Sequence, residues 1–341
     1  MATSRPRLDD VAQRSGVSPA TASLVLRERP GPSAETRRRV LDAATALGYR
    51  ADRSASLLAR RRTHLLGVTM DVSNPFHAEL LEDIHVAAAE RGYDVVVGPL
   101  TRVRDERQTA LGLVDQRCET LVLLGTGIPR LDLVQLAEST PLVVVGRQVR
   151  GPGISVVRAA DDHGVAAAVE HLADLGHRRI AFVDGLPGPI ATLRREGFRR
   201  AMRRYAGDDD PSVVPGGYTE QAGILAPLAS ISPSPTAVLA FNDRCALGVM
   251  DQLRAAGLEV PRDVSVVGFD DSPVARLRTI SLTTVSQEPA TMAVAAVEAA
   301  VRAAVSGRAE EAAHLCREVV LEPRLVVRAT TGPPPQSSVS G

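Results

Sequence analysis

The sequence contains no tryptophan and no lysine, and its other aromatic residues are four tyrosines and five phenylalanines. Large aromatic side chains therefore cannot fill its interior, and the cores must be built from alanine, valine and leucine. The chain of 341 residues is long enough for two or three domains, with 44% hydrophobic residues to fill their cores. Because arginine supplies all 40 basic charges, on every part of the chain, we give its use no functional weight.

Cysteine is scarce, and long apolar runs and a secretion signal are missing. Cys118, Cys245 and Cys316 are far apart and odd in number, which predicts reduced thiols and excludes a disulfide framework or a cysteine metal site. No apolar run approaches the roughly 20 residues that a membrane span needs, and the amino terminus has no apolar signal core. We therefore expect a soluble, cytoplasmic protein without a membrane segment, metal or cofactor.

Charge is divided unevenly along the chain, although the formal net charge is zero. Residues 1–63 carry thirteen arginines and six acidic residues, a net +7, whereas residues 64–341 carry twenty-seven arginines and thirty-four acidic residues, a net −7. A basic amino-terminal module on an acidic body is the charge distribution expected of a DNA-binding head. Any small domain can be basic by chance, so charge alone does not decide the function.

The amino-terminal residues predict a three-helix head over residues 1–49. A short helix around residues 8–15 ends at Gly16, and a second begins with Ser18 as its cap and Pro19 at its first position. A third helix is capped by Ser33 and stopped by Gly48. Two short helices joined by a glycine-containing turn are the layout of a helix-turn-helix, whose second helix reads DNA.

The rest of the chain predicts an α/β body. Residues 50–63 are too short for a stable independent helix and are interpreted as a hinge. From residue 65, apolar strands alternate with helices, and the series restarts after residue 164, which predicts two doubly wound parallel-sheet lobes over residues 64–329 with a cleft between them. The proline- and serine-rich residues 330–341 are predicted to be disordered.

Short motifs along the chain add up to a resemblance to one family. The motifs are residues 8–12, 17–21, 35–40 and 47–50 in the head, and residues 74–76, 171–172, 175–180, 241–243, 264–271 and 282–285 in the body. In this order, from about residue 7 to residue 329, the chain resembles the lactose-repressor (LacI/GalR) family of transcriptional regulators. The resemblance implies a homodimer with two DNA-binding heads, a hinge and a body similar to periplasmic sugar-binding proteins.

The resemblance implies which residues contact a palindromic double-stranded DNA operator. These residues are Ser18, Pro19, Ala20, Thr21, Ser23, Leu24, Arg37, Tyr49, Leu58 and Ala59. Leu58 matches a hinge leucine that inserts into the minor groove, although it could instead pack against the other hinge. Leu24 stands where the family often has a base-contacting arginine, and it either packs, touches a thymine methyl or marks a distinctive operator. Ala51 and Ser56 also depart from the family pattern.

Arginine runs in the head are further candidates for DNA contact. They are residues 37–39 and residues 60–62. Within a basic head, we expect at least one member of each run to contact phosphate, which gives salt-dependent affinity without sequence information. A solvated face is the alternative interpretation of each run.

The resemblance also implies an effector site in the cleft, formed by Phe76, Arg147, His163, Arg194, Asn242, Asp270 and Gln287. Paired hydrogen bonds from a carboxylate and a guanidinium, an amide and an aromatic face suit a small carbohydrate. The alternative is that Asn242 and Asp270 cap helices and that Arg194 is a surface charge.

The leading hypothesis is a repressor whose affinity for its operator is set by a small molecule, most simply a sugar, that closes the lobes. Control by a protein partner or by a non-sugar metabolite is the alternative. A solute-binding protein without DNA function conflicts with the basic head and the missing signal segment. An enzyme is disfavoured because no nucleophile elbow, phosphate loop or metal triad is present in the sequence.

Overall fold

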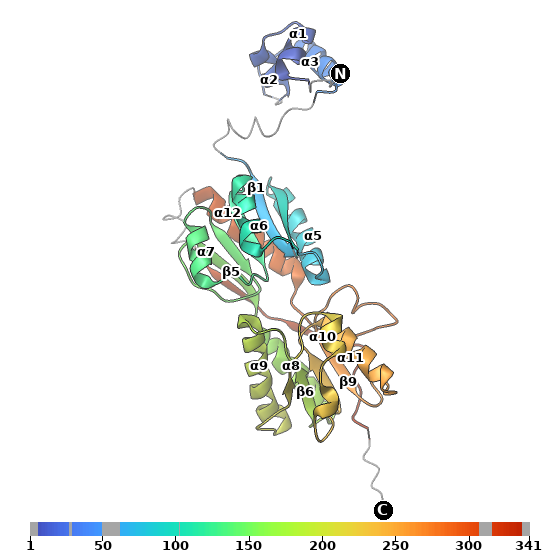
Figure 1. The fold of residues 1–341 in the computed structure, drawn as a ribbon. Helices are drawn as coiled ribbons and strands as arrows, with labels where there is room; N and C mark the ends of the chain where they lie inside the picture. Colours follow the sequence, from blue (N-terminus) through green and yellow to red (C-terminus); the bar gives the residue numbers. More distant parts are fainter. Residues whose placement is uncertain (1–5, 27–28, 50–61, 102, 307–315, 336–341) are drawn as a thin grey trace, which may run out of the picture. The chain divides into compact units, whose positions relative to one another are not determined.

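The computed structural model describes residues 6–26, 29–49, 62–101, 103–306 and 316–335 (Figure 1). Contacts divide the chain into two units, residues 1–63 and residues 64–341. The first unit contains the three helices of the head, and the second contains two α/β lobes.

The head consists of α1 (Leu8–Ser15), α2 (Pro19–Leu26) and α3 (Ala34–Leu47). The caps predicted from the sequence are confirmed: the Ser18 and Ser33 hydroxyl oxygens accept hydrogen bonds from the backbone three residues on, at 3.1 and 3.2 Å. Gly16 and Gly48 end α1 and α3 with φ angles of 64° and 62°, a left-handed conformation that glycine adopts without strain. Seven buried apolar residues close the core: Val11, Ala12, Ala22, Val25, Val40, Ala43 and Ala44.

The first lobe contains a six-stranded, entirely parallel sheet in the order β11-β5-β4-β3-β1-β2. Its strands are β1 (Leu65–Asp71), β2 (Asp94–Leu100), β3 (Thr120–Leu124), β4 (Leu142–Val145), β5 (Ile154–Ala159) and β11 (Glu318–Leu321). Helices α5 (Pro75–Glu90) and α12 (Pro289–Ser306) pack on one face, and α6 (Glu106–Asp115) and α7 (Arg130–Ala137) on the other. Every residue of β3 and β4 is buried, as expected of a sheet covered on both faces.

The second lobe repeats this plan in the order β12-β10-β9-β8-β6-β7, with only β12 antiparallel to its neighbour. Its strands are β6 (Ile180–Val183), β7 (Val213–Val214), β8 (Ala237–Ala240), β9 (Ser265–Asp270), β10 (Thr283–Ser286) and β12 (Arg324–Val326). Its α-helices are α8 (Asp161–Asp174), α9 (Pro189–Ala201), α10 (Glu220–Ile224) and α11 (Asp243–Ala255), with short helical turns at Met202–Ala206 and Leu228–Ser230.

The lobes are interleaved in sequence, because the chain passes between them three times: after β5, after β10 and between β11 and β12. Strands β5, β7, β10, β11 and β12 and helix α12 were not predicted from the sequence. Most of these strands have only two to four residues, too few to show a period. Helix α12 lacks a single apolar stripe, since Val294 and Val305 are exposed while its opposite side is buried.

Helix α12 is the one described helix long and apolar enough to span a membrane by length and composition. Glu298 and Arg302 interrupt it, so it is not a continuous apolar run. Six of its residues, Met292, Ala293, Ala296, Val297, Ala299 and Ala300, lie in the core of the first lobe, which accounts for its composition.

Residues 330–335 pack on the second lobe, so the predicted disorder is wrong for this part of the tail. The Thr330 hydroxyl donates to the Val266 carbonyl at 2.7 Å and accepts from the Thr283 amide at 2.9 Å. The His177 ring donates from Nε2 to the Gly332 carbonyl at 2.8 Å. Composition suggested disorder, but these bonds tie Thr330 and Gly332 to the second lobe. Residues 336–341 lie outside the described residues.

Candidate functional site

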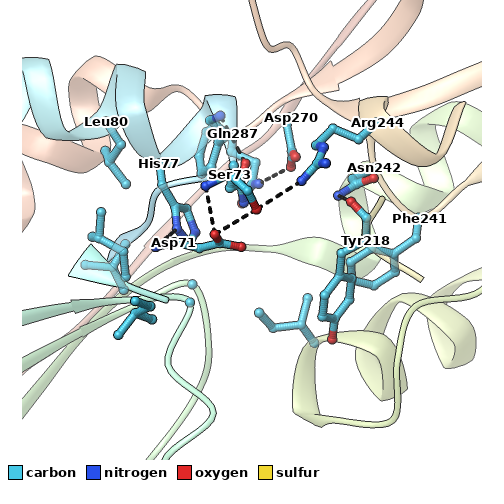
Figure 2. Close-up of a pocket in the computed structure, with 18 of the residues that line it drawn as sticks. Asp71, Ser73, His77, Leu80, Tyr218, Phe241, Asn242, Arg244, Asp270 and Gln287 are labelled. Carbon is cyan, nitrogen blue, oxygen red and sulfur yellow. Dashed lines mark hydrogen bonds between the residues drawn. The ribbon is translucent and has the colours of Figure 1, made fainter. Parts of the chain in front are cut away.

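A cavity of about 710 Å³ lies between the two lobes (Figure 2). Both sheets have the same strand order, with the reversal at β1/β3 and at β6/β8, and the cavity opens at the carboxyl ends of these strands. Five of the seven residues predicted to bind an effector line it: Phe76, Arg194, Asn242, Asp270 and Gln287. The fold therefore brings together residues that are separated by more than 200 positions in sequence.

Arg147 and His163 do not line this cavity, so the structure does not bring them together with the other five, and their part in effector binding stays a prediction. Gly146, with a φ of 98°, turns the backbone after β4, and the Arg147 guanidinium then donates to the Ile128 carbonyl inside the first lobe. His163 is exposed, and its Nδ1 lies 3.1 Å from both carboxylate oxygens of Glu322.

Arg194 projects from α9 into a buried ion pair at the edge of the cavity. Its Nε donates to Asp161 Oδ1 at 2.7 Å, and one Nη donates to the Phe241 carbonyl. The guanidinium carbon lies 3.6 Å from the Phe269 ring centroid and 4.6 Å from that of Phe241. With a side chain only 4% exposed, Arg194 is not a surface charge. Its position is fixed by four contacts with three residues before any ligand binds.

Asp270 ends β9 with a φ of 115° and faces the cavity. One of its carboxylate oxygens, Oδ1, accepts a hydrogen bond from Gln287 Nε2 at 2.7 Å. Burial raises the pKa of Asp270 to about 8, although the nearby Arg194 favours the ionised form. Asp243, buried at the start of α11, has its pKa raised to about 6 by burial. The alternative that Asp270 caps a helix is wrong, because turns and not a helix follow β9 over residues 273–280.

Asn242 both caps a helix and lines the cavity, so the two interpretations of this residue coexist. Its Oδ1 accepts from the Cys245 amide at 2.9 Å, and its Nδ2 donates to the Tyr218 carbonyl at 3.2 Å. The Tyr218 and Phe241 rings lie 4.9 Å apart beside it. Phe76 faces the same cavity from the other lobe.

Several lining residues were not predicted from the sequence, namely Asp71, Ser73, His77, Tyr218 and Arg244. Asp71 Oδ1 accepts from the Ser73 amide and hydroxyl, both at 2.8 Å. His77 Nδ1 accepts from the Asp71 amide at 3.2 Å, which leaves the ring proton on Nε2. Burial lowers the pKa of His77 to about 4, so the ring is neutral near pH 7. Asp71 lies at the carboxyl end of β1, and this position could have led to the prediction of these residues from the sequence.

The cavity offers hydrogen-bond donors and acceptors beside aromatic faces. Asp71 supplies a carboxylate acceptor, Asp270 supplies a carboxyl group whose raised pKa keeps it protonated near pH 7, and Arg194 and His77 supply donors. Hydroxyl groups can donate to the acceptors and accept from the donors, and sugar rings stack on aromatic faces. Within the described part of the chain, no group of three or more His, Cys, Asp and Glu side chains could hold a metal.

Two polar contacts join the lobes beside the cavity. Arg276, from the second lobe, donates to Glu79 of α5 at 2.8 Å and to the Asp271 carbonyl at 2.6 Å. Arg244 of α11 lies 3.4 Å from the Ser73 hydroxyl and is held by Glu220 at 2.6 Å. Asp271 follows Asp270 directly, so the Glu79–Arg276 pair is anchored next to a cavity residue.

Glu79→Gln is expected to shift the lobes toward a more open arrangement, because a neutral amide bonds Arg276 more weakly than a carboxylate does. Since the Arg276 side chain is 42% exposed, we expect an effect below about 1 kcal/mol. Distances between spin labels, one on each lobe, should lengthen in the variant. Glu90→Gln, on the same helix with a 69% exposed side chain, is the control and should change nothing. Equal distances in Glu79→Gln and the unchanged protein would contradict the prediction.

The residues predicted to contact DNA from α2 lie on its accessible side. Ser18, Pro19, Ala20 and Leu24 are exposed, whereas Thr21 and Ser23 are half-buried. Outside α2, Tyr49 packs half-buried against the head core, and Arg37 donates to the Arg29 carbonyl at 3.0 Å. Leu58, Ala59, Ala51, Ser56 and residues 60–61 lie outside the described residues. The DNA contacts stay predictions.

Comparison with known proteins places this geometry in context. Residues 7–52 match the model of bacterial regulatory proteins of the lacI family, and residues 169–331 match a periplasmic binding protein-like domain. The chain is 34% identical to an uncharacterised HTH-type transcriptional regulator in the aml 5′ region of Streptomyces limosus, over 96% of this chain and 94% of the relative.

Solved structures show the same architecture. The lac repressor dimer bound to operator and the anti-inducer ONPF is 27% identical and superposes with a TM-score of 0.82, covering 96% of this chain and all of that chain. The complex of the transcriptional regulator CelR with cellobiose is 30% identical with a TM-score of 0.69, at the same coverage.

Proposed function

The chain belongs to the LacI family of bacterial regulatory proteins, and from this premise we propose that it is a repressor whose operator affinity is set by a carbohydrate bound between its lobes. Membership makes it a DNA-binding transcriptional regulator with an effector-binding domain, in a family without enzymatic activity. We place it in the cytoplasm, where regulators of this family act. The observation that carries the proposal is the cavity at the strand ends, with Asp270 and Arg194 fixed at its edge.

A carbohydrate is the effector class that best fits the lining. Two carboxyl groups, a guanidinium and an amide line the cavity, and each lobe contributes an aromatic side chain to it. Among similar structures, CelR is in complex with cellobiose. A non-sugar metabolite or a protein partner docking on the body is the alternative mode of control.

The proposed regulator acts as a homodimer on a palindromic operator, as the dimeric lac repressor structure suggests. Val97 on edge strand β2 is 41% exposed and nearby Val103 is 94% exposed, which supports association through the first lobe. Ligand binding changes the angle between the lobes, which positions the two hinges and heads. The coupling free energy between effector binding and operator binding equals the difference in the free energy of effector binding between the two lobe arrangements.

Selection of bound genomic fragments by the full-length protein tests the proposal. We expect a palindrome of two short half-sites around a central CG step. A sugar related to the neighbouring genes should change the affinity for it. Enrichment without a consensus would contradict sequence-specific regulation, and a consensus without response to any sugar would favour control by another ligand or a protein.

Leu58→Ala is expected to lose specific operator binding and to keep salt-sensitive non-specific binding, because it removes the proposed minor-groove wedge. Competition between operator and random DNA measures both quantities. Leu57→Ala is the neighbouring control. Unchanged operator affinity in Leu58→Ala would exclude the wedge.

A further inference from the structure

The exposed side of α2 is mainly apolar. Pro19 and Ala20 are exposed at its start, and Leu24 is 42% exposed one turn later. Residues four positions apart lie on the same side of a helix, so Ala20 and Leu24 present neighbouring methyl groups to solvent. An exposed leucine on a helix of eight residues contributes nothing to the head core, which is closed by Ala22 and Val25 from the opposite side.

The Ser18 and Thr21 hydroxyl groups on this side are partly engaged within the head. The Ser18 and Thr21 hydroxyls bond each other at 2.9 Å, and Ser18 Oγ also accepts from the Thr21 amide. Ser23 is the one remaining hydroxyl of α2 without a hydrogen bond in the described structure.

Two nearby arginines also make contacts within the head. Arg37 donates to the Arg29 carbonyl, and Arg39 donates to the carbonyls of Ser15 and Gly16, where it holds the turn between α1 and α2. These contacts hold both guanidinium groups against the head, whereas the exposed Ala20 and Leu24 side chains carry no group that could donate to a guanine edge.

We propose that α2 reads its operator through thymine methyl groups, with Ala20 and Leu24 as the residues that determine specificity. The thymine C5-methyl is the apolar group that the bases present in the major groove, and small apolar side chains contact it. The proposal rests on the proposed function, since it requires α2 to lie in the major groove of an operator.

Replacing thymine by deoxyuridine tests the proposal, because this change removes only the methyl group and leaves base pairing intact. The probe is the duplex selected by the full-length protein, with each half-site thymine replaced in turn. We expect at least one position at which the deoxyuridine duplex binds about fourfold more weakly, the factor for burying one methyl group.

Leu24→Ala links the effect to this side chain. The variant should bind the thymine duplex several-fold more weakly and lose the discrimination between thymine and deoxyuridine. Leu41→Ala is the matched control, because Leu41 is a 47% exposed leucine of the same head on α3, and it should keep the discrimination.

Equal affinity of the unchanged protein for thymine and deoxyuridine duplexes at every position would overturn the proposal, and this comparison requires no variant. Discrimination that survives in Leu24→Ala would overturn the role of Leu24. A selection that yields no consensus would instead overturn the proposed function itself, so the two failures are distinguishable.

Discussion

Arg194→Met is expected to lower the free energy of unfolding by about 3–5 kcal/mol, the cost of leaving one member of a buried ion pair without its partner. Asp161 is only 1% exposed, and its Oδ2 has no hydrogen-bond partner in the described structure. The variant also loses the guanidinium between the Phe241 and Phe269 rings. Urea unfolding monitored by circular dichroism measures the change.

The pH dependence identifies the cause of this destabilisation. Burial raises the pKa of Asp161 and Arg194 opposes the rise, so removal of Arg194 raises this pKa further. The folded variant therefore holds a proton on Asp161 at a pH at which the unfolded chain has lost it. The loss in free energy of unfolding, relative to the unchanged protein, should be smaller at pH 5 than at pH 8.

Two further variants serve as controls for Arg194. The double variant Arg194→Met with Asp161→Asn removes both charges and should recover most of the loss. Arg199→Met, an exposed arginine of the same helix, should change stability by less than about 0.5 kcal/mol. A loss in Arg194→Met as small as that in Arg199→Met would contradict the buried pair.

Asp270→Asn is expected to flatten the pH dependence of stability and to weaken the effector response. Asp270 keeps its proton up to about pH 8 in the folded protein, whereas the unfolded chain releases it near pH 4. Between these values the unfolded state binds fewer protons, so stability falls as pH rises, by up to about 1.4 kcal/mol per pH unit. Asparagine cannot ionise, so the variant should lack this contribution and exceed the unchanged protein in stability at pH 8.

Unfolding curves at pH 5, 6, 7 and 8 measure this effect. Asp243, whose pKa is raised to about 6, adds its own pH dependence of stability below that pH in both proteins. Asp209→Asn, at an exposed carboxylate of the same lobe, is the control and should leave the slope unchanged. Identical slopes in Asp270→Asn and the unchanged protein would contradict the raised pKa.

The effector response of Asp270→Asn is a separate readout. In asparagine an NH2 group, which only donates, replaces one of the two carboxyl oxygens of Asp270, so the variant presents a different hydrogen-bonding pattern to a ligand hydroxyl. Loss of one hydrogen bond to the ligand should weaken effector binding roughly 2- to 10-fold. An unchanged response to the effector would mean that the ligand does not contact Asp270.

Local signals in the sequence determined the head and the broad plan of the body. Serine caps, a proline at the first helical position and terminal glycines act over three or four residues, so Ser18, Pro19, Gly16 and Gly48 specify α1, α2 and α3 without distant contacts. The buried strands of the sheets are visible as apolar runs for the same reason.

The residues of the cleft were only partly accessible to sequence reasoning. Asn242 and Asp270 follow or end buried strands, and the carboxyl ends of parallel strands meet at one edge, so their convergence could be predicted. Asp71 satisfies the same rule and was overlooked. Arg147 also follows a strand, but the left-handed turn at Gly146 directs it into the first lobe.

Tertiary structure alone decided the partners that set the chemistry of the site. The pairing of Arg194 with Asp161, the neutral ring of His77, the contact of Glu79 with Arg276 and the docking of Thr330 each join segments brought together by packing or by buried hydrogen bonds. The sequence by itself determined where the head helices and strands β1, β3, β4, β6, β8 and β9 form, because propensity and capping are local. Which charges are buried, paired or exposed depended on how the two lobes pack, because desolvation is a property of the assembled fold.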